Sequence, residues 1–153
     1  MKGIVFKLRK GKHSVIYINS LFKKCNKDGK VYFSSNIPIV NGTYFNEIMF
    51  CVKYGGINRF VVADIEKFVN FPSKGIPSDC SQFSPDGYCA DCSNWFLISN
   101  MREVFSCYLS GLIIVDIDGN TKEFSESVAN SNFSRLNYIS KSDYDNDSDV
   151  LLK

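Results

Sequence analysis

The hydrophobic pattern of this chain is that of a protein built mainly from β-strands. Its most organised stretch runs from Ile48 to Phe68, where two apolar runs rich in β-branched residues flank the turn Tyr54-Gly55-Gly56. Apolar runs separated by a Gly-Gly pair are typical of a β-hairpin. The second run includes the continuous apolar stretch Phe60-Val61-Val62-Ala63, as expected for a strand buried on both faces. We therefore predict that this hairpin is the structural core.

Further strands are predicted on both sides of the hairpin. They are an edge strand over Gly3 to Leu8, then Val31 to Phe33, Asn94 to Val104, and Gly111 to Ile117, which turns at Asp118-Gly119 into Thr121 to Phe124.

Other segments carry weaker patterns. The apolar spacing in Ser14 to Phe22 fits a short helix as well as a strand, and this choice stays open. Lys23 to Lys30 is predicted to be a polar turn, and residues 125–140 one short helix. Residues 70–93 contain three prolines and no sustained periodicity, which predicts a long loop.

The predicted fold class is mostly β (α+β). We expect a small open β-barrel, or a strongly bent antiparallel sheet, with one or two short helices. Residues 1–140 are predicted to form a single β domain. Residues 141–153 are predicted to form an acidic flexible tail because of their composition.

Composition supports a globular protein. Apolar residues make up 44% of the 153 residues and include thirteen Phe, eight Tyr and one Trp, which is enough for a substantial core. No apolar run approaches the roughly 18 residues that a membrane-spanning helix needs, and the apolar segment after Met1 is too short for a signal peptide. We expect a cytoplasmic protein with no membrane partner, whose six cysteines remain thiols or bind metal.

The net charge of +2 hides a marked asymmetry. Residues 1–30 carry nine Lys or Arg and one acid, whereas residues 116–149 carry three basic and eight acidic residues. A basic segment is typical of a surface that faces a polyanion, although it can also be ordinary solvated surface. The side chains expected to neutralise phosphates are Lys7, Arg9, Lys10, Lys12, Lys23, Lys24, Lys27 and Lys30, together with Arg59.

Aromatic residues beside polar or glycine residues add to the case for nucleic acid. Tyr54, Trp95 and Phe96 have such neighbours, and aromatic rings in these places can stack on bases. The alternative for Trp95 is a position at the rim of the core, since Trp is highly buried on average.

The cysteines suggest one zinc site. Cys89-Ala90-Asp91-Cys92 has the C-x2-C spacing of half a tetrahedral site, which Cys80 and Cys107 would complete. A second C-x2-C pair or a His pair is missing, since the only histidine is His13. The alternative is that the loop cysteines have no metal role and that Cys51 and Cys107 are small buried hydrophobic residues inside strands. No other cofactor is expected.

Catalytic templates are not matched. A single histidine in a Lys-rich segment offers no Ser-His-Asp or Cys-His pair, and no phosphate-binding loop is present. Asp116 and Asp118 share a strand face, a pattern that can bind a divalent ion, but ordinary acids at a strand end explain them more simply. We expect a protein that is not an enzyme.

Four segments occur in a suggestive order. Lys30-Val31-Tyr32-Phe33 is followed by Asn58 to Ile65, and then by Gly87-Tyr88 and Asn94 to Val104. This order resembles the small PUA-like β-barrels of the ASCH and EVE type, over about residues 30–105. The G-x-K-x-x-E-x-R signature of many ASCH proteins is absent, so enzymatic activity is not implied. The resemblance implies an open barrel that binds RNA, or a modified base or nucleoside, in a cleft near Tyr54, Asn94 and Trp95.

These observations predict a non-catalytic binding module for nucleic acid or a modified base or nucleotide. The basic N-terminal face would contact phosphates, and Trp95 with Tyr54 would stack on a base. The alternative is a small phage-type inhibitor or accessory protein that binds a host protein, which the small size and the acidic tail fit equally well. A third interpretation is a zinc-stabilised interaction domain using Cys80, Cys89, Cys92 and Cys107.

Overall fold

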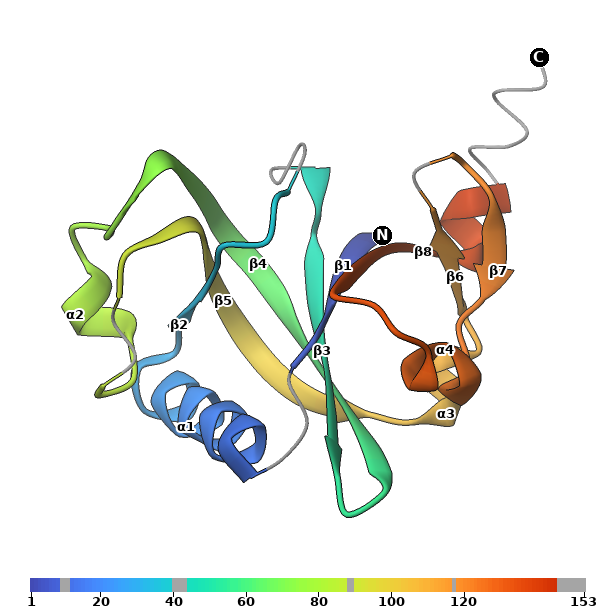
Figure 1. Ribbon diagram of the computed structural model, residues 1–153, viewed down its shortest axis with the longest axis horizontal. Coiled ribbons are helices and arrows are strands. Elements are labelled where there is room, and N and C mark those ends of the chain that lie inside the picture. Colours follow the sequence, from blue (N-terminus) through green and yellow to red (C-terminus); the bar gives the residue numbers. More distant parts are fainter. Residues whose placement is uncertain (9–11, 40–43, 88–89, 117, 146–153) are drawn as a thin grey trace.

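The computed structural model describes residues 1–8, 12–39, 44–87, 90–116 and 118–145 (Figure 1). The strands in these ranges are β1 (Lys2–Lys7), β2 (Val31–Ser35), β3 (Glu47–Tyr54), β4 (Ile57–Gly75), β5 (Cys92–Val104), β6 (Leu112–Val115), β7 (Thr121–Glu123) and β8 (Arg135–Ser140). The helices are α1 (Lys12–Asp28), α2 (Cys80–Phe83), α3 (Ser106–Leu109) and α4 (Glu126–Asn130), and residues 141–145 are also helical.

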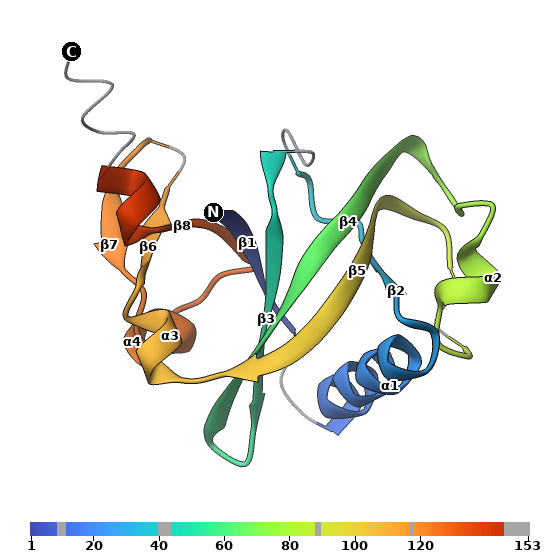
Figure 2. The same ribbon diagram turned by 180° about the vertical axis from the view of Figure 1, so that it is seen from behind.

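In the described part of the chain, the strands form one eight-stranded sheet in the order β2-β5-β4-β3-β1-β8-β6-β7. The β1–β3 pair is parallel, and the other pairs are antiparallel. The sheet is not closed, and α1 and α2 lie toward one end of it while α3 and α4 lie toward the other (Figures 1 and 2). The predicted mostly β fold with an open, bent sheet is therefore confirmed, although the sheet is mixed and α1 is a long helix.

The predicted hairpin forms the centre of the sheet as β3 and β4. Tyr54 pairs with Ile57, and the turn between them consists of Gly55 and Gly56 with φ of +61° and +80°. Two successive positive φ angles define the turn type that matches the twist of a hairpin, and glycine adopts them without steric cost.

The central strands are buried on both faces. Ile48 and Phe50 of β3 belong to one hydrophobic core, the α1 core, together with Ile18 of α1. Met49 and Cys51 of β3 point to the other face and belong to a second core, the α3–α4 core, which those two helices help to cover. Strands in such a position are apolar throughout, which explains the uninterrupted apolar runs of the hairpin.

Helix α1 resolves the choice that the sequence left open. The predicted polar turn over Lys23 to Lys30 is wrong because the helix continues to Asp28. Its buried residues Ile18, Leu21 and Cys25 recur at helical spacing and extend the apolar stripe into the Lys-rich segment. The helix packs on β2, β3 and β5.

The predicted loop over residues 70–93 is wrong in part, because β4 includes residues 70–75, α2 includes 80–83 and β5 begins at Cys92. Strand β4 runs on to Gly75 because it stays paired with β5, with register shifts between Val62 and Asp64, Ile65 and Lys67, and Asn70 and Gly75. The last shift spans Pro72, which cannot donate a ladder hydrogen bond.

Beneath this extension lies a small third core, which has no counterpart in the sequence prediction. Its buried residues are Tyr32, Cys80, Trp95 and Leu97.

Strand β8 was missed from the sequence, and it changes the position of β1. Because β8 pairs with β1 and β6, β1 lies inside the sheet rather than at its edge. A Cβ on Gly3 would lie 2.1 Å from Cζ of Tyr138, so the close approach of this ring requires glycine. The predicted β6–β7 hairpin is confirmed.

The start of the predicted acidic tail is ordered by contacts with the N-terminus. Asp143 forms an ion pair with the amino group of Met1 and accepts a hydrogen bond from Ser140 Oγ. Residues 146–153 lie outside the described ranges. Over the residues described, none of the helices has the length and apolar character needed to cross a membrane.

Candidate functional site

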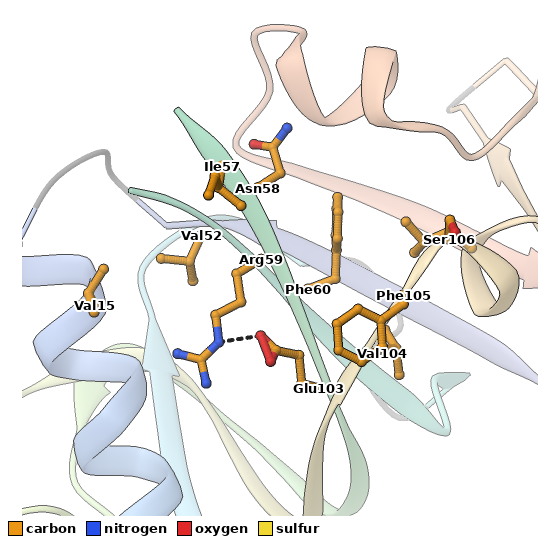
Figure 3. Close-up of a pocket in the computed structure, with 11 residues that line it drawn as sticks. Val15, Val52, Ile57, Asn58, Arg59, Phe60, Glu103, Val104, Phe105 and Ser106 are labelled. Carbon is orange, nitrogen blue, oxygen red and sulfur yellow. Dashed lines mark hydrogen bonds and ion pairs between the residues drawn. The ribbon is translucent and has the colours of Figure 1, made fainter. Parts of the chain in front are cut away.

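A groove of about 500 Å³ lies beside the turn end of the β3–β4 hairpin. Figure 3 shows its lining, which comes from α1, both hairpin strands, the end of β5 and α3. The residues are Val15, Val52, Ile57, Asn58, Arg59, Phe60, Glu103, Val104, Phe105, Ser106 and Leu109. A concave and mostly apolar surface of this size with a few polar groups is typical of a binding site. We call it the hairpin groove.

Two large apolar side chains stand exposed on the rim of the hairpin groove. Ile57 is 73% exposed and directly follows the Gly55-Gly56 turn, and Phe105 is 66% exposed and precedes α3. Beneath them, Phe60 and Leu109 are buried in the α3–α4 core. Exposed apolar groups beside an apolar floor are a feature of surfaces that bind other molecules.

An ion pair crosses the floor of the groove from β4 to β5. Arg59 Nε lies 2.5 Å from Glu103 Oε1, as the dashed line in Figure 3 marks. The Arg59 guanidinium also donates to Asn19 Oδ1 at 3.2 Å and lies 5.6 Å from the ring centre of Phe22. Arg59 therefore ties α1 to the hairpin, and its charge is balanced by Glu103.

A second polar cluster surrounds Glu47, whose side chain is 5% exposed. Tyr108 Oη donates to both carboxylate oxygens at 2.6 Å, and Tyr138 Oη donates to Oε2 at 2.8 Å. Arg102 Nη2 donates to Oε1 at 3.2 Å. We call these four residues the Glu47 cluster.

A bulge in β5 places Arg102 within the Glu47 cluster. Val62 pairs with Arg102 and Asp64 with Ser99, so β5 has one more residue than β4 in this interval. Asn100 in the bulge adopts a positive φ of +53°, as short polar side chains tolerate.

Burial and the Glu47 carboxylate together raise the pKa values of the two tyrosines in the Glu47 cluster. Burial, followed by the negative charge and the hydrogen bond of Glu47, raises the pKa of Tyr138 well above its ordinary value. The pKa of Tyr108 is raised by burial and by the same carboxylate, with Arg102 opposing the shift. Both hydroxyls therefore keep their protons and act as donors to Glu47 in the folded protein.

Two further concave surfaces carry lysines from the basic segment. One, of about 530 Å³, is lined by Lys7, Leu8, Ile37, Asn130, Ser131, Asn132, Phe133 and Ser134. The other, of about 330 Å³, is lined by Ser20, Lys23, Lys24, Lys27, Pro85 and Asp86. We call them the Lys7 pocket and the α1 lysine pocket. In the latter, Lys24 forms an ion pair with Asp28 at 2.7 Å.

The structure places two of the residues predicted to lie at the base, Trp95 and Asn94, in the interior. Trp95 is 1% exposed, and its Nε1–H donates to Gly75 O and Cys92 O. Asn94 is also buried, and its amide nitrogen donates to Ile37 O. A ring covered in this way offers no face to a base, so Trp95 takes the core position that was its alternative.

The other predicted contacts are dispersed. Arg59 lies in the hairpin groove, Lys7 in the Lys7 pocket, and Lys23 and Lys24 in the α1 lysine pocket. Lys12 begins α1. Arg9 and Lys10, and the side chains of Lys12 and Tyr54, lie outside what the structure describes.

The cysteines do not gather into a metal centre among the described residues. Cys80 is disulfide-bonded, which corrects the expectation that all six cysteines remain thiols or bind metal. Cys92 and Cys107 are free thiols, and Cys107 is exposed rather than buried. Cys89 lies outside the described ranges. No group of three or more His, Cys, Asp or Glu in the described residues is placed to hold an ion.

The hairpin groove was not predicted from the sequence. Ile57 was the one local signal, because a large apolar residue directly after a Gly-Gly turn has little chance of burial within its own hairpin. Phe105 and Glu103 become groove residues only through the pairing of β5 with β4.

Comparisons with protein-family models, curated proteins and solved structures give no match to this chain. The resemblance to PUA-like barrels therefore stays a prediction.

Proposed function

We propose that this protein is a non-catalytic binding protein whose hairpin groove receives an apolar side chain of a protein partner. The observation that carries the proposal is the pair of rim residues, Ile57 and Phe105, exposed by 73% and 66% above a buried apolar floor. Aromatic and aliphatic anchors in a central pocket supply most of the binding energy in protein interfaces.

The charges in the groove favour a segment that is apolar and uncharged at its anchor. Arg59 and Glu103 are bonded to each other, so the groove presents neither a free cation for phosphate nor a free anion for a basic peptide. A leucine or phenylalanine side chain of the partner, placed between Ile57 and Phe105, would contact both of these rim residues. The ion pair, about one third exposed, would stay at the edge of such an interface, where charged groups contribute little.

The test begins with a nuclease-treated pull-down using the full-length protein, followed by affinity measurements on the partner that it identifies. We expect Phe105→Ala and Ile57→Ala each to weaken binding about tenfold or more, as interface anchors do. Ile76→Ala is the matched control, because Ile76 is also exposed and does not line the groove. Since the rim side chains are largely exposed, melting temperatures should stay unchanged. Equal weakening by all three variants would refute the proposal.

Nucleic-acid binding is a second candidate, and a specific observation favours it. The α1 lysine pocket brings Lys23, Lys24 and Lys27 together on one surface of the basic segment. Such a site contacts phosphates, so its affinity should fall steeply with salt. Filter binding of single-stranded RNA at rising salt, with Lys23→Gln/Lys27→Gln against Lys67→Gln, measures this directly. No binding at low salt would eliminate this candidate.

A further inference from the structure

The Lys7 pocket combines three chemical features at one place. It is lined by a lysine from β1, by the apolar side chains of Leu8, Ile37 and Phe133, and by the amide and hydroxyl side chains of residues 130–132 and 134. Its volume of about 530 Å³ lies in the range of small-ligand sites. It shares no lining residue with the hairpin groove.

The ammonium group of Lys7 is fixed in this pocket. Its Nζ donates to Ser131 O at 2.6 Å and lies 5.2 Å from the ring centre of Phe133. The backbone N–H of Lys7 bonds to Ser134 O at 3.0 Å, which holds the strand against the same loop. An ammonium has three donors, so it can serve a ligand oxygen as well as Ser131.

The electrostatic surroundings favour an anion. None of the described residues that line the pocket is an aspartate or glutamate, so the positive charge of Lys7 has no carboxylate within the lining. A phosphate on Lys7 would therefore bind in a positive local field.

The remaining wall fits a planar polar ring. Phe133, Leu8 and Ile37 are half-buried and pack against the two main cores, so their exposed surfaces form a firm apolar wall. Asn132 is exposed at the pocket, and an asparagine amide can both donate and accept, as the edges of nucleobases require. Asn130 Oδ1 is already occupied by Lys53 and Asn58.

We infer that the Lys7 pocket binds a nucleoside monophosphate, with the phosphate on Lys7 and the base against the apolar wall beside Asn132. The same chemistry is found in a free mononucleotide and in the 5′-phosphorylated end of a strand. This inference goes beyond the proposed function, and it stands or falls independently of the hairpin groove because the two sites use different residues.

The test is a titration of the full-length protein with AMP at low salt, in which binding is measured by amide NMR shifts or by calorimetry. Adenosine, inorganic phosphate, and a short oligonucleotide with or without a 5′-phosphate are the comparison ligands. We expect AMP to bind more tightly than adenosine or phosphate alone. Binding of the phosphorylated oligonucleotide as well would assign the site to strand ends, and binding of AMP alone would assign it to the free nucleotide.

Variants distinguish binding of AMP at the Lys7 pocket from nonspecific binding of AMP to positively charged surface. Lys7→Gln should weaken AMP binding about tenfold or more, since the fixed ammonium is lost, and Lys7→Arg should restore part of it. Lys67→Gln removes one exposed lysine on β4 and should leave the affinity unchanged. The inference is overturned if AMP does not bind in the millimolar range, if phosphate alone binds as tightly as AMP, or if both glutamine variants weaken binding equally.

Discussion

Replacing Glu47 by glutamine tests how much of the fold depends on one buried carboxylate. Glu47 accepts hydrogen bonds from Tyr108, Tyr138 and Arg102, and its side chain is 5% exposed. Glutamine has nearly the same shape, but its NH₂ group donates and cannot accept. Whichever way the amide turns, either Tyr138 Oη or Arg102 Nη2 faces the NH₂ group instead of an acceptor, and the Arg102 charge loses its counter-charge.

The structure sets the size of the effect. A buried donor left without a partner costs about 1–3 kcal/mol, and breaking a buried ion pair costs about 3–5 kcal/mol. Arg102 is 38% exposed and also reaches Asp64, so water and Asp64 offset part of the second cost. We expect a loss of about 3 kcal/mol in the free energy of unfolding. For a chain of this size, that is a fall of about 6–12 °C in melting temperature.

Urea unfolding followed by circular dichroism measures this loss, and Glu103→Gln is the matched control. Glu103 also pairs with an arginine across neighbouring strands, but its side chain is 34% exposed. Removing an exposed ion pair costs about 0–1 kcal/mol. Similar losses for both variants would refute the argument from burial, and Tyr138→Phe, which removes one buried donor, should fall between them.

Two further predictions concern the same region. Gly3→Ala places a Cβ 2.1 Å from the Tyr138 ring and should lower the free energy of unfolding by about 1–3 kcal/mol. Gly111→Ala is the control, because the nearest atom to its Cβ lies at 3.5 Å, and it should leave the free energy of unfolding unchanged. Thermal melting of both variants measures the difference. The raised pKa values of Tyr108 and Tyr138 mean that the folded state keeps protons that unfolded tyrosines lose at about pH 10. Stability is then fully present below about pH 10 and falls as the pH rises above it, and urea midpoints that stay flat to pH 11 would contradict this.

Local signals in the sequence were enough to predict part of the fold. The β3–β4 hairpin follows from its Gly-Gly pair. Its turn needs two successive positive φ angles, and glycine adopts them without steric cost. The uninterrupted apolar run Phe60-Val61-Val62-Ala63 of β4 predicted a strand buried on both faces, because successive side chains of a strand point to opposite faces and here all of them are apolar. The β6–β7 hairpin follows from its Asp-Gly turn in the same way.

The rest of the fold depends on contacts between segments that are distant in the sequence. Strand β4 continues past Pro72 because β5 supplies partners that outweigh the local cost of proline, and this extension buries Trp95. Trp95, which the sequence suggested as a base-stacking residue, is therefore part of the third core.

The candidate sites have the same origin. Ile57 and Phe105 share one groove only because β5 pairs with β4, and Lys7 meets Phe133 only because β8 pairs with β1. Sequence periodicity reports which side of a strand is apolar, but it carries no information on which strands become neighbours. The positions of the hairpin groove and the Lys7 pocket were therefore set by sheet order.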